Sequence, residues 1–148
     1  MQKIILSSPE ETEQFAADLF KCVPEKCLIF LQGDLGAGKT TLVRGFMRAA
    51  GYDGVVKSPT YNIVEEYELE QRLFYHFDLY RLVDAEELEW LGMEDYLKAN
   101  SVCFIEWPDN GDGYLTVPDI ILTLSVRENE RELLINKMPE KIYQCLSC

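Results

Sequence analysis

The residues with the clearest chemistry form one loop that fits the phosphate-binding pattern G-x-x-x-x-G-K-[ST] at every fixed position. They are Gly33, Asp34, Leu35, Gly36, Ala37, Gly38, Lys39 and Thr40. Glycines at these spacings let backbone N–H groups turn inward around a phosphate, with no Cβ to block its approach. In this pattern the lysine reaches the β- and γ-phosphates, and the threonine hydroxyl binds Mg²⁺. The loop therefore predicts a bound nucleoside triphosphate with Mg²⁺.

The flanks of this loop have the strand–loop–helix order that its mechanism needs. The apolar run 27–31 precedes the loop and indicates a buried strand, and the stretch 40–47 follows as a helix. The N-terminus of that helix adds the positive end of a dipole beside the phosphate. A glycine-rich turn that binds nothing is the alternative, and the agreement between the pattern and its flanks disfavours it.

Nucleotide hydrolysis also needs a carboxylate at the end of a second buried strand, where it organises Mg²⁺ and water. The apolar run 102–105 ends in Glu106, which is the Walker B layout with Glu in place of Asp. The run 73–77 ends in Asp78, but it alternates in polarity, so we expect a half-exposed strand there. We predict Glu106 as the Walker B-type acid and Asp78 as a second acid that organises Mg²⁺ or water. A solvated acid at a strand end is the alternative for each.

The only histidine of the chain, His76, lies two positions before Asp78. In a strand this spacing puts both side chains on the same face. A lone histidine in a strand is more often structural than functional, and the sequence favours the structural interpretation.

Three further residues lie close to these motifs along the chain. Thr60 follows Ser58-Pro59, in the interval where P-loop proteins often carry the loop that senses the γ-phosphate. Trp107 follows Glu106, and packing against the sheet and a role in the site are equally open for it. Arg81 could anchor a phosphate or pair with an acid.

Missing motifs narrow the class of nucleotide-binding protein. The guanine-reading pattern Asn-Lys-x-Asp is absent, because residues 136–139 read Asn-Lys-Met-Pro. No Asp-x-x-Gly follows the phosphate loop either, so a GTPase of the Ras type is disfavoured and ATP is the predicted nucleotide. No arginine-rich lid of a kinase is visible, and no arginine stands out as an arginine finger, although Arg81 and Arg131 are candidates.

Composition constrains the partners. The 148 residues include 14 Lys and Arg against 26 Asp and Glu, which gives a net charge of −12. A field of this sign repels phosphate backbones, so we expect no direct nucleic-acid binding by this chain alone and favour a protein partner with a basic face. A hydrophobic content of 47% is typical of a globular protein, and we expect one P-loop nucleotide-binding domain over residues 1–148.

The sequence shows no membrane-spanning or secretion signal, which bears on the compartment of the protein. No apolar run approaches the ~18 residues of a membrane span, and the N-terminal apolar stretch is too short for a signal peptide. We therefore expect a cytoplasmic protein without membrane contact.

Five cysteines, an odd number, predict free thiols in that compartment. The terminal Cys145-Leu146-Ser147-Cys148 is a CxxC, for which a redox or zinc half-site is the less favoured alternative.

The remaining segments predict a mixed α/β domain. Ser8-Pro9 opens a helix that ends at Pro24, and 61–69 with 73–80 indicates a hairpin inserted after the P-loop helix. We further expect strands at 4–7, 101–107, 119–126 and 131–136, and helices from Asp84, over 93–98 and over 138–145. This order favours a three-layer α/β P-loop NTPase fold, with a mixed sheet that has an antiparallel portion.

Four motifs in order give the chain a close resemblance to the TsaE (YjeE) family of small bacterial P-loop ATPases. They are the loop 33–41, Ser58-Pro59-Thr60, the hexapeptide His-Phe-Asp-Leu-Tyr-Arg at 76–81, and Glu106-Trp107-Pro108. The resemblance covers nearly the whole chain, from the first helix to the last strand pair. Four ordered motifs are far more specific than the phosphate loop alone.

The resemblance implies a role in making N6-threonylcarbamoyladenosine at position 37 of tRNAs that read codons starting with A. It also implies partnership with the TsaB and TsaD proteins, of which TsaD carries the transfer chemistry. The ATPase would reset or regulate that complex and would not itself modify tRNA. That role agrees with the acidic charge, because another subunit would hold the tRNA.

The resemblance also implies roles for individual residues, each assigned by its position in the matching motif. The resemblance assigns nucleotide binding to 33–41, which adds Thr41 to the loop, a switch-like role to Thr60, and acidic site roles to Asp78 and Glu106, with Trp107 following as in the family pattern. The position of Tyr61 is often Phe in such proteins, and the terminal CxxC is not part of the pattern.

The predicted activity is a Mg²⁺-dependent ATPase that is slow without its partners. Water would attack the γ-phosphate in line, while the loop, Lys39 and Mg²⁺ hold the charge and Glu106 or Asp78 orients water or metal. A small-molecule kinase and a nucleotide-gated binding module without turnover are the alternatives. Free phosphate released without an acceptor distinguishes the ATPase from both.

Overall fold

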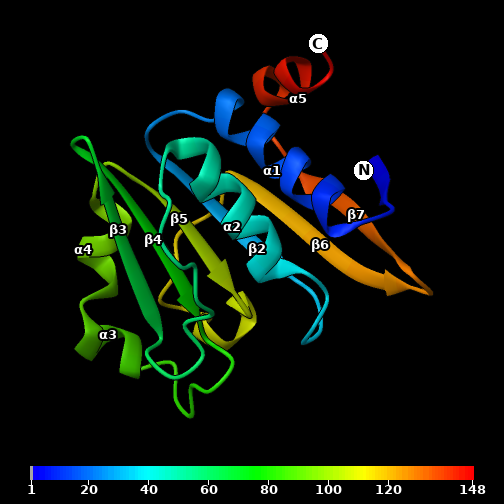
Figure 1. Ribbon diagram of the computed structural model, residues 1–148. Coiled ribbons are helices and arrows are strands. Elements are labelled where there is room, and N and C mark those ends of the chain that lie inside the picture. Colours follow the sequence, from blue (N-terminus) through cyan, green and yellow to red (C-terminus); the bar gives the residue numbers. More distant parts are fainter. Residues whose placement is uncertain (1) are drawn as a thin grey trace.

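A mixed sheet of seven strands forms the centre of the structure, a computed structural model that describes residues 2–148 (Figure 1). Its strand order is β1-β7-β6-β2-β5-β4-β3. The strands are β1 (Gln2–Leu6), β2 (Cys27–Gln32), β3 (Val64–Leu69), β4 (Arg72–Asp78), β5 (Ser101–Glu106), β6 (Ile120–Arg127) and β7 (Glu130–Lys137). The helices are α1 (Pro9–Cys22), α2 (Lys39–Ala50), α3 (Glu87–Leu91), α4 (Met93–Lys98) and α5 (Glu140–Leu146), and a short 3-10 helix, η1 (Pro108–Gly111), follows β5.

The sheet combines a parallel centre with antiparallel edges. Strands β6, β2, β5 and β4 run parallel to one another. Strands β7 and β1 extend the sheet beyond β6 in antiparallel pairing, and β3 pairs antiparallel with β4 at the opposite edge. This arrangement confirms the predicted mixed sheet with an antiparallel portion, and the predicted hairpin after the P-loop helix is β3–β4.

Helices cover both faces of the sheet and give the three predicted layers (Figure 1). Helices α1, α2 and α5 lie on one face, where Leu19, Phe46 and Ile142 belong to the larger buried cluster. Helices α3 and α4 lie on the other face, where Leu88 and Met93 belong to a second cluster. Because a central parallel strand has helices on both sides, all six residues of β5 are buried.

Strand β4 differs from its prediction. The alternating sequence suggested a half-exposed strand, but Phe74, His76, Phe77 and Asp78 are all buried. The prediction was wrong because β3 continues the sheet beyond β4, so β4 is not an edge strand, and because Phe74, on the face that carries His76 and Asp78, packs in the cluster with residues of α1 and α2. Asp78 is therefore placed inside the protein and not in solvent.

Several element boundaries also differ from their predictions, and three of them have a clear local reason. Strand β3 begins at Val64 and not at residue 61, because the Ile63 N–H donates to the Pro59 carbonyl at 2.7 Å and closes a turn. Helix α3 begins at Glu87, after a turn in which the Glu87 carboxylate accepts from the Asp84 N–H at 3.0 Å. Helix α5 begins at Glu140, because the residue before Pro139 is disfavoured in a helical conformation.

The predicted free state of all cysteines is wrong for two of them. Cys22, at the end of α1, and Cys145, in α5, form a disulfide with their Cα atoms 5.7 Å apart. Their sequence separation of 123 residues hid this proximity, which exists only because α5 folds back onto α1. Cys27 and Cys103 are free and buried, and Cys148 is free and exposed. The terminal CxxC is thus divided between a disulfide and a free thiol.

Among residues 2–148, no helix is both long enough and apolar enough to cross a membrane. The longest helix, α1, has 14 residues, whereas a span needs ~20.

Candidate nucleotide-binding and hydrolysis site

The phosphate loop connects β2 to α2 and lies at the carboxyl end of the parallel strands. Gly33 opens the loop with φ +144°, and a Cβ at this position would collide with the carbonyl oxygen of Leu124 in β6. Gly38 caps α2 with φ +108°, a left-handed conformation that a residue with a Cβ rarely adopts. These two glycines explain the fixed positions of the motif: one permits a close approach of two backbones, and the other turns the chain into the helix.

Lys39 is turned inward across the loop. Its side chain is only 5% exposed, and its ammonium donates a hydrogen bond to the Gly33 carbonyl at 2.5 Å. The same nitrogen lies 3.4 Å from Glu106 Oε1 and 4.6 Å from the centre of the Trp107 ring. The lysine is therefore a buried cation held between the phosphate loop and the end of β5.

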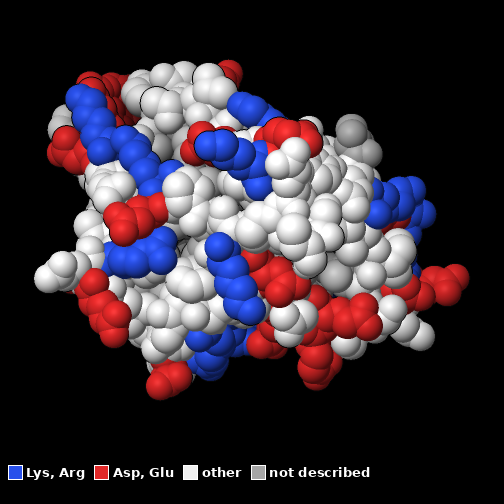
Figure 2. Space-filling model, turned by 90° about the horizontal axis from the view of Figure 1, so that it is seen from above, with Lys and Arg blue, Asp and Glu red and all other residues white. Residues whose placement is uncertain are grey.

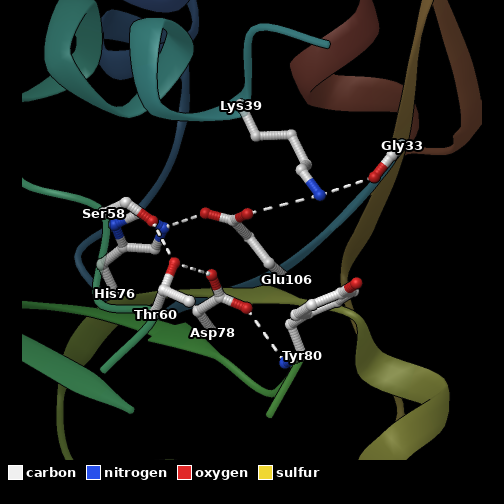
Figure 3. Close-up of polar contacts among 8 residues, drawn as sticks. All are labelled: Gly33, Lys39, Ser58, Thr60, His76, Asp78, Tyr80 and Glu106. Atoms are coloured by element: carbon white, nitrogen blue, oxygen red, sulfur yellow. Dashed lines mark hydrogen bonds and ion pairs between the residues drawn. The ribbon is translucent and has the colours of Figure 1, made fainter. Parts of the chain in front are cut away.

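Glu106 lies between Lys39 and His76, as Figure 3 shows. His76 Nε2 donates to Glu106 Oε2 at 2.5 Å, while Lys39 faces Oε1, so each carboxylate oxygen has its own partner. Glu106 is 3% exposed and His76 is fully buried. Because an ionised carboxylate can only accept, this contact places a proton on Nε2. His76, for which the sequence favoured a structural role, therefore contacts the residue that was predicted as the Walker B-type acid.

Asp78 lies next to Glu106 because β4 and β5 are parallel and pair these two residues in register. Asp78 Oδ2 accepts from the Thr60 hydroxyl at 3.0 Å, and Oδ1 accepts from the Tyr80 N–H at 3.0 Å. The Thr60 hydroxyl is also 2.7 Å from the Ser58 hydroxyl (Figure 3). The Ser-Pro-Thr segment is therefore anchored to the acid at the end of β4.

Trp107 has an unusual backbone for a large residue. Its φ is +56°, in the left-handed region, where a bulky side chain is a genuine outlier. Its ring contacts Lys39 on one side and lies 5.0 Å from the Tyr80 ring on the other. Its buried Nε1 has no hydrogen-bond partner among residues 2–148. Strain of this kind persists where the surroundings enforce it, and it is frequent at functional sites.

The structure brings together most of the residues predicted from sequence. Lys39, Thr60, Asp78, Glu106 and Trp107 form one connected cluster beside the loop. Thr40 and Thr41 lie in the first turn of α2 and are partly buried, whereas Asp34, Leu35 and Gly36 are exposed at the tip of the loop. Arg81 does not reach this cluster, since its guanidinium stacks on the Tyr61 ring at 4.4 Å.

Sequence reasoning missed two members of the cluster. Tyr80 supplies its N–H to Asp78 and its ring to Trp107, and Ser58 supplies a hydroxyl to Thr60. Both residues stand inside the quoted motifs, so their proximity to the site was visible. Their contacts were not, because a backbone donor and a hydroxyl carry no specific chemical signature in a sequence.

The donor set fits a Mg²⁺–nucleotide. Carboxylate and hydroxyl oxygens are the hard ligands that Mg²⁺ prefers, and Mg²⁺ in such sites keeps several waters and binds substrate phosphates. Among residues 2–148, no group of three His, Cys, Asp or Glu side chains is arranged to hold a metal ion by itself. One or two protein carboxylates with phosphate and water ligands would complete such a site, and Lys39 would supply a positive charge for the phosphates.

A sizeable cavity lies away from this cluster. It has a volume of about 940 Å³ and is lined by α4, the segment 113–117 and the first residues of β2 and β5. Ligands of open α/β sheets bind at the carboxyl ends of the strands, and this cavity is at the amino ends. Its lining mixes Lys26 and Lys98 with Glu94 and Asp95, so its charge indicates no ligand class. We therefore place the candidate site at the phosphate loop and not at this cavity.

Comparison with known proteins agrees with the motifs. Residues 6–134 match the model of the family described as Threonylcarbamoyl adenosine biosynthesis protein TsaE. A tRNA threonylcarbamoyladenosine biosynthesis protein TsaE of Haemophilus influenzae is 48% identical over 122 residues, which is 82% of this chain and 77% of that protein. The TsaE of Rickettsia typhi is 32% identical over 142 residues, 95% of this chain and 98% of that protein.

The fold has a close counterpart among solved structures. The crystal structure of YdiB from Bacillus subtilis superposes with a TM-score of 0.81 at 27% identity, covering 99% of this chain and 93% of the other. The family match ends at residue 134, so α5 and its Cys145 lie beyond the matched residues, whereas the disulfide partner Cys22 lies within them.

Proposed function

We propose that this chain, which belongs to the TsaE family, is an ATP-binding and ATP-hydrolysing subunit of the bacterial complex that installs N6-threonylcarbamoyladenosine at position 37 of tRNA. Family membership places the chain in tRNA threonylcarbamoyladenosine biosynthesis. The finer proposal adds a nucleotide, a metal, a reaction and partners, and each of these has its own support.

One observation carries the proposal of hydrolysis. The buried carboxylate of Glu106 lies 3.4 Å from the loop lysine Lys39, and Asp78 pairs with Glu106 in strand register. A complete phosphate loop thus faces two acids at the ends of neighbouring parallel strands, which is the arrangement that P-loop hydrolases use. Binding alone would not require a second acid fixed beside the first.

The ion pair of Lys39 with Glu106 indicates how the site changes on binding. The lysine now contacts the Gly33 carbonyl and the Glu106 carboxylate, yet its role in the motif is to hold the β- and γ-phosphates. We infer that phosphate replaces these two partners. Glu106 then keeps His76 as its fixed contact, with Oε1 released to orient the attacking water or a metal ligand.

The other candidate residues would each act at a different part of the nucleotide site. Thr40 and the two acids would hold Mg²⁺, and the metal would supply positive charge to neutralise the negative charge that develops on the phosphates. Thr60 hydrogen-bonds Asp78 and so links the Ser-Pro-Thr segment to the metal and γ-phosphate side. A segment held by one hydroxyl–carboxylate contact is suited to sense whether that phosphate is present.

The proposed partners are TsaB and TsaD, with tRNA held by another subunit. The net charge of −12 supports this division, because a chain with this charge repels a polyanion and attracts a protein with a basic face. We further propose that turnover is slow in the isolated chain, since Arg81, one candidate arginine finger, stacks on Tyr61 away from the acids.

The test is ATP binding and phosphate release by the purified chain, alone and with TsaB and TsaD. Lys39→Ala should weaken ATP binding by about 10- to 100-fold, the value of a charge-assisted contact, and remove most turnover. Lys21→Ala, a change at an exposed lysine near the end of α1, is the matched control. A folded Lys39→Ala protein with unchanged binding and turnover would refute the site. Phosphate release that requires an added metabolite would instead identify a kinase.

A further inference from the structure

The C-terminal helix α5 is held on α1 by a small apolar contact and by the disulfide. Figure 1 shows α5 at the outside of the molecule, against α1. Ile142 is its only buried residue, while Tyr143 and Leu146 are partly buried. Among residues 2–148, no hydrogen bond or ion pair joins the two helices. A helix of seven residues is too short to be stable alone, so its docking depends strongly on the Cys22–Cys145 bond.

This disulfide is accessible from solvent. Cys145 is exposed and Cys22 is half-buried, so a small thiol in solution reaches Cys145 more easily. Exposed disulfides exchange readily with thiols, whereas structural disulfides resist reduction. In the reducing compartment expected from the sequence, a bond of this kind is typical of redox sensing and not of permanent stabilisation.

A third thiol lies one turn away from the bond. Cys148 is free and exposed, and its N–H donates to the Cys145 carbonyl at 3.3 Å. A four-residue turn closed in this way brings its first and last Cα atoms within about 7 Å, and disulfides join Cα atoms roughly 4.4–6.8 Å apart. The Cys148 thiol also donates to the Gln144 carbonyl at 3.3 Å, so its side chain points back along the helix. The other free thiols, Cys27 and Cys103, are buried and do not compete.

We propose that Cys148 is the resolving thiol of a redox-sensitive clamp that holds α5 on α1. The thiolate of a small thiol attacks Cys145, the bond to Cys22 breaks, and Cys22 leaves as a thiolate that takes up a proton from water. Cys148 then loses its proton, attacks Cys145, expels the small thiol and forms a Cys145–Cys148 bond. One disulfide thus moves from between two helices to within one, with no net gain or loss of electrons, and the small thiol is regenerated.

Two thiols of the chain compete for the mixed disulfide on Cys145. Cys22 re-forms the original bond while α5 stays docked, whereas Cys148 reaches Cys145 in either state because the two share one turn. A tethered thiol has an effective concentration in the mM range, so at about 0.1 mM external thiol Cys148 reacts roughly tenfold faster than a second external thiol. Once the bond lies within α5, only the small apolar contact remains, and the helix undocks.

The experiment treats the full oxidised chain with about 0.1 mM glutathione, quenches it with an alkylating reagent and locates thiols and disulfides by peptide mass spectrometry. Wild-type protein should accumulate a Cys145–Cys148 bond together with alkylated Cys22. Cys148→Ser should open the bond between the helices roughly tenfold more slowly, because the second step then needs another glutathione. Ser147→Ala changes the neighbouring residue and keeps every thiol, so this matched control should behave like the wild type.

Brief trypsin digestion of the same samples measures the docking of α5. Lys141 is exposed in this helix, and cleavage after it requires the helix to open locally. Glutathione should therefore accelerate this cleavage in wild-type protein and much less in Cys148→Ser. The cleaved peptide 142–148 stays attached to the chain through Cys22 while the original bond is present, and it is released once the bond lies within the helix.

Each other outcome contradicts the proposal. Equal opening rates in wild type and Cys148→Ser overturn the resolving role, as does opening without a Cys145–Cys148 product. A Cys22–Cys148 product overturns the assigned route, because it requires attack at Cys22. Unchanged cleavage after Lys141 in the opened protein overturns the clamp, by showing that apolar packing alone holds α5. Alkylation of Cys22 before glutathione is added would leave no bond to resolve.

Discussion

Glu106 is the residue on which the chemistry of this site converges. Its two carboxylate oxygens contact different partners, Lys39 through Oε1 and His76 through Oε2. Asp78 is instead hydrogen-bonded by Thr60 and by the Tyr80 backbone, and it has no cation within ion-pair distance among the described residues. Two adjacent acids with such different partners are expected to have separate tasks.

We predict that Glu106→Gln binds Mg–ATP but suppresses hydrolysis, because the amide keeps the shape of the carboxylate and lacks its charge. Asp78→Asn should first weaken Mg²⁺-dependent ATP binding and loosen the Thr60 segment. Magnesium titrations of ATP binding, together with single-turnover hydrolysis, measure both effects. Normal hydrolysis by Glu106→Gln, combined with intact binding and no turnover in Asp78→Asn, would mean that the two roles are reversed.

His76 is predicted to act through Glu106 as a positioning residue. His76→Phe fills a similar buried volume but removes the donor to Oε2, so kcat should fall about 10- to 100-fold while the dissociation constant of ATP stays within about twofold. His76→Gln, which can still donate, should recover part of kcat. Steady-state kinetics and ATP titrations separate the two quantities. Equal losses in both variants, accompanied by a lower melting temperature, would show that the ring is needed only for packing.

At the scale of elements, strand register and two connections build the site. The parallel pairing of β4 with β5 places Asp78 beside Glu106, and the Asp78 N–H donates to the Ile63 carbonyl at 2.8 Å, which fixes the turn after Ser-Pro-Thr. The Leu79 N–H donates to the Glu106 carbonyl at 3.1 Å and joins the two strand ends. The P-loop helix α2 packs against α1, and the disulfide connects α1 to α5.

Reduction of the Cys22–Cys145 disulfide is predicted to lower the free energy of unfolding by about 2–5 kcal/mol, because the bond closes a loop of 123 residues in the unfolded chain. Urea unfolding with and without a thiol reductant measures the change, and Cys22→Ser should reproduce it. Cys148→Ser is the matched control and should unfold at the wild-type midpoint without reductant. Equal midpoints for reduced and oxidised protein would contradict this prediction.

The thiols offer an independent check on the same bond. Burial raises the pKa of Cys27 to about 12 and raises the pKa of Cys103 well above its usual range, so both stay protonated and unreactive at neutral pH. Native protein without reductant should therefore take up one alkyl group, at Cys148, as measured by mass spectrometry. Rapid labelling of Cys22 or Cys145 would show that the disulfide is absent.

At the scale of the whole molecule, charge is the property that bears on partners. The chain carries −12 in net charge, and on the face seen in Figure 2 basic side chains are interrupted by acidic and uncharged ones. Such a surface gives a polyanion no continuous track. The proposed nucleotide would instead be held by local donors, which the loop and Lys39 would provide.

We predict that turnover of the isolated chain is slow and rises when TsaB and TsaD are added. An arginine finger or an ordered switch segment supplied by another protein can increase the rate by ~10³–10⁵. Phosphate release with ATP and with GTP, each with and without the partners, tests this, and ATP should be preferred throughout. A fast isolated enzyme indifferent to both proteins would count against the proposed assembly.

The sequence alone determined the parts of this protein whose signal is local. The loop 33–40, the strand before it and the helix after it obey a fixed spacing, because phosphate binding imposes backbone geometry on consecutive residues. The hairpin after the P-loop helix and the buried strand that ends in Glu106 were visible for the same reason: alternation and apolar runs are properties of short segments.

Only the tertiary structure decided what depends on distant segments meeting. The burial of Asp78 required β3 to extend the sheet, the contact of His76 with Glu106 required β4 to pair with β5, and the disulfide required α5 to fold back on α1. Sheet order and helix docking are set by the burial of the whole core, and no short stretch of sequence encodes that burial.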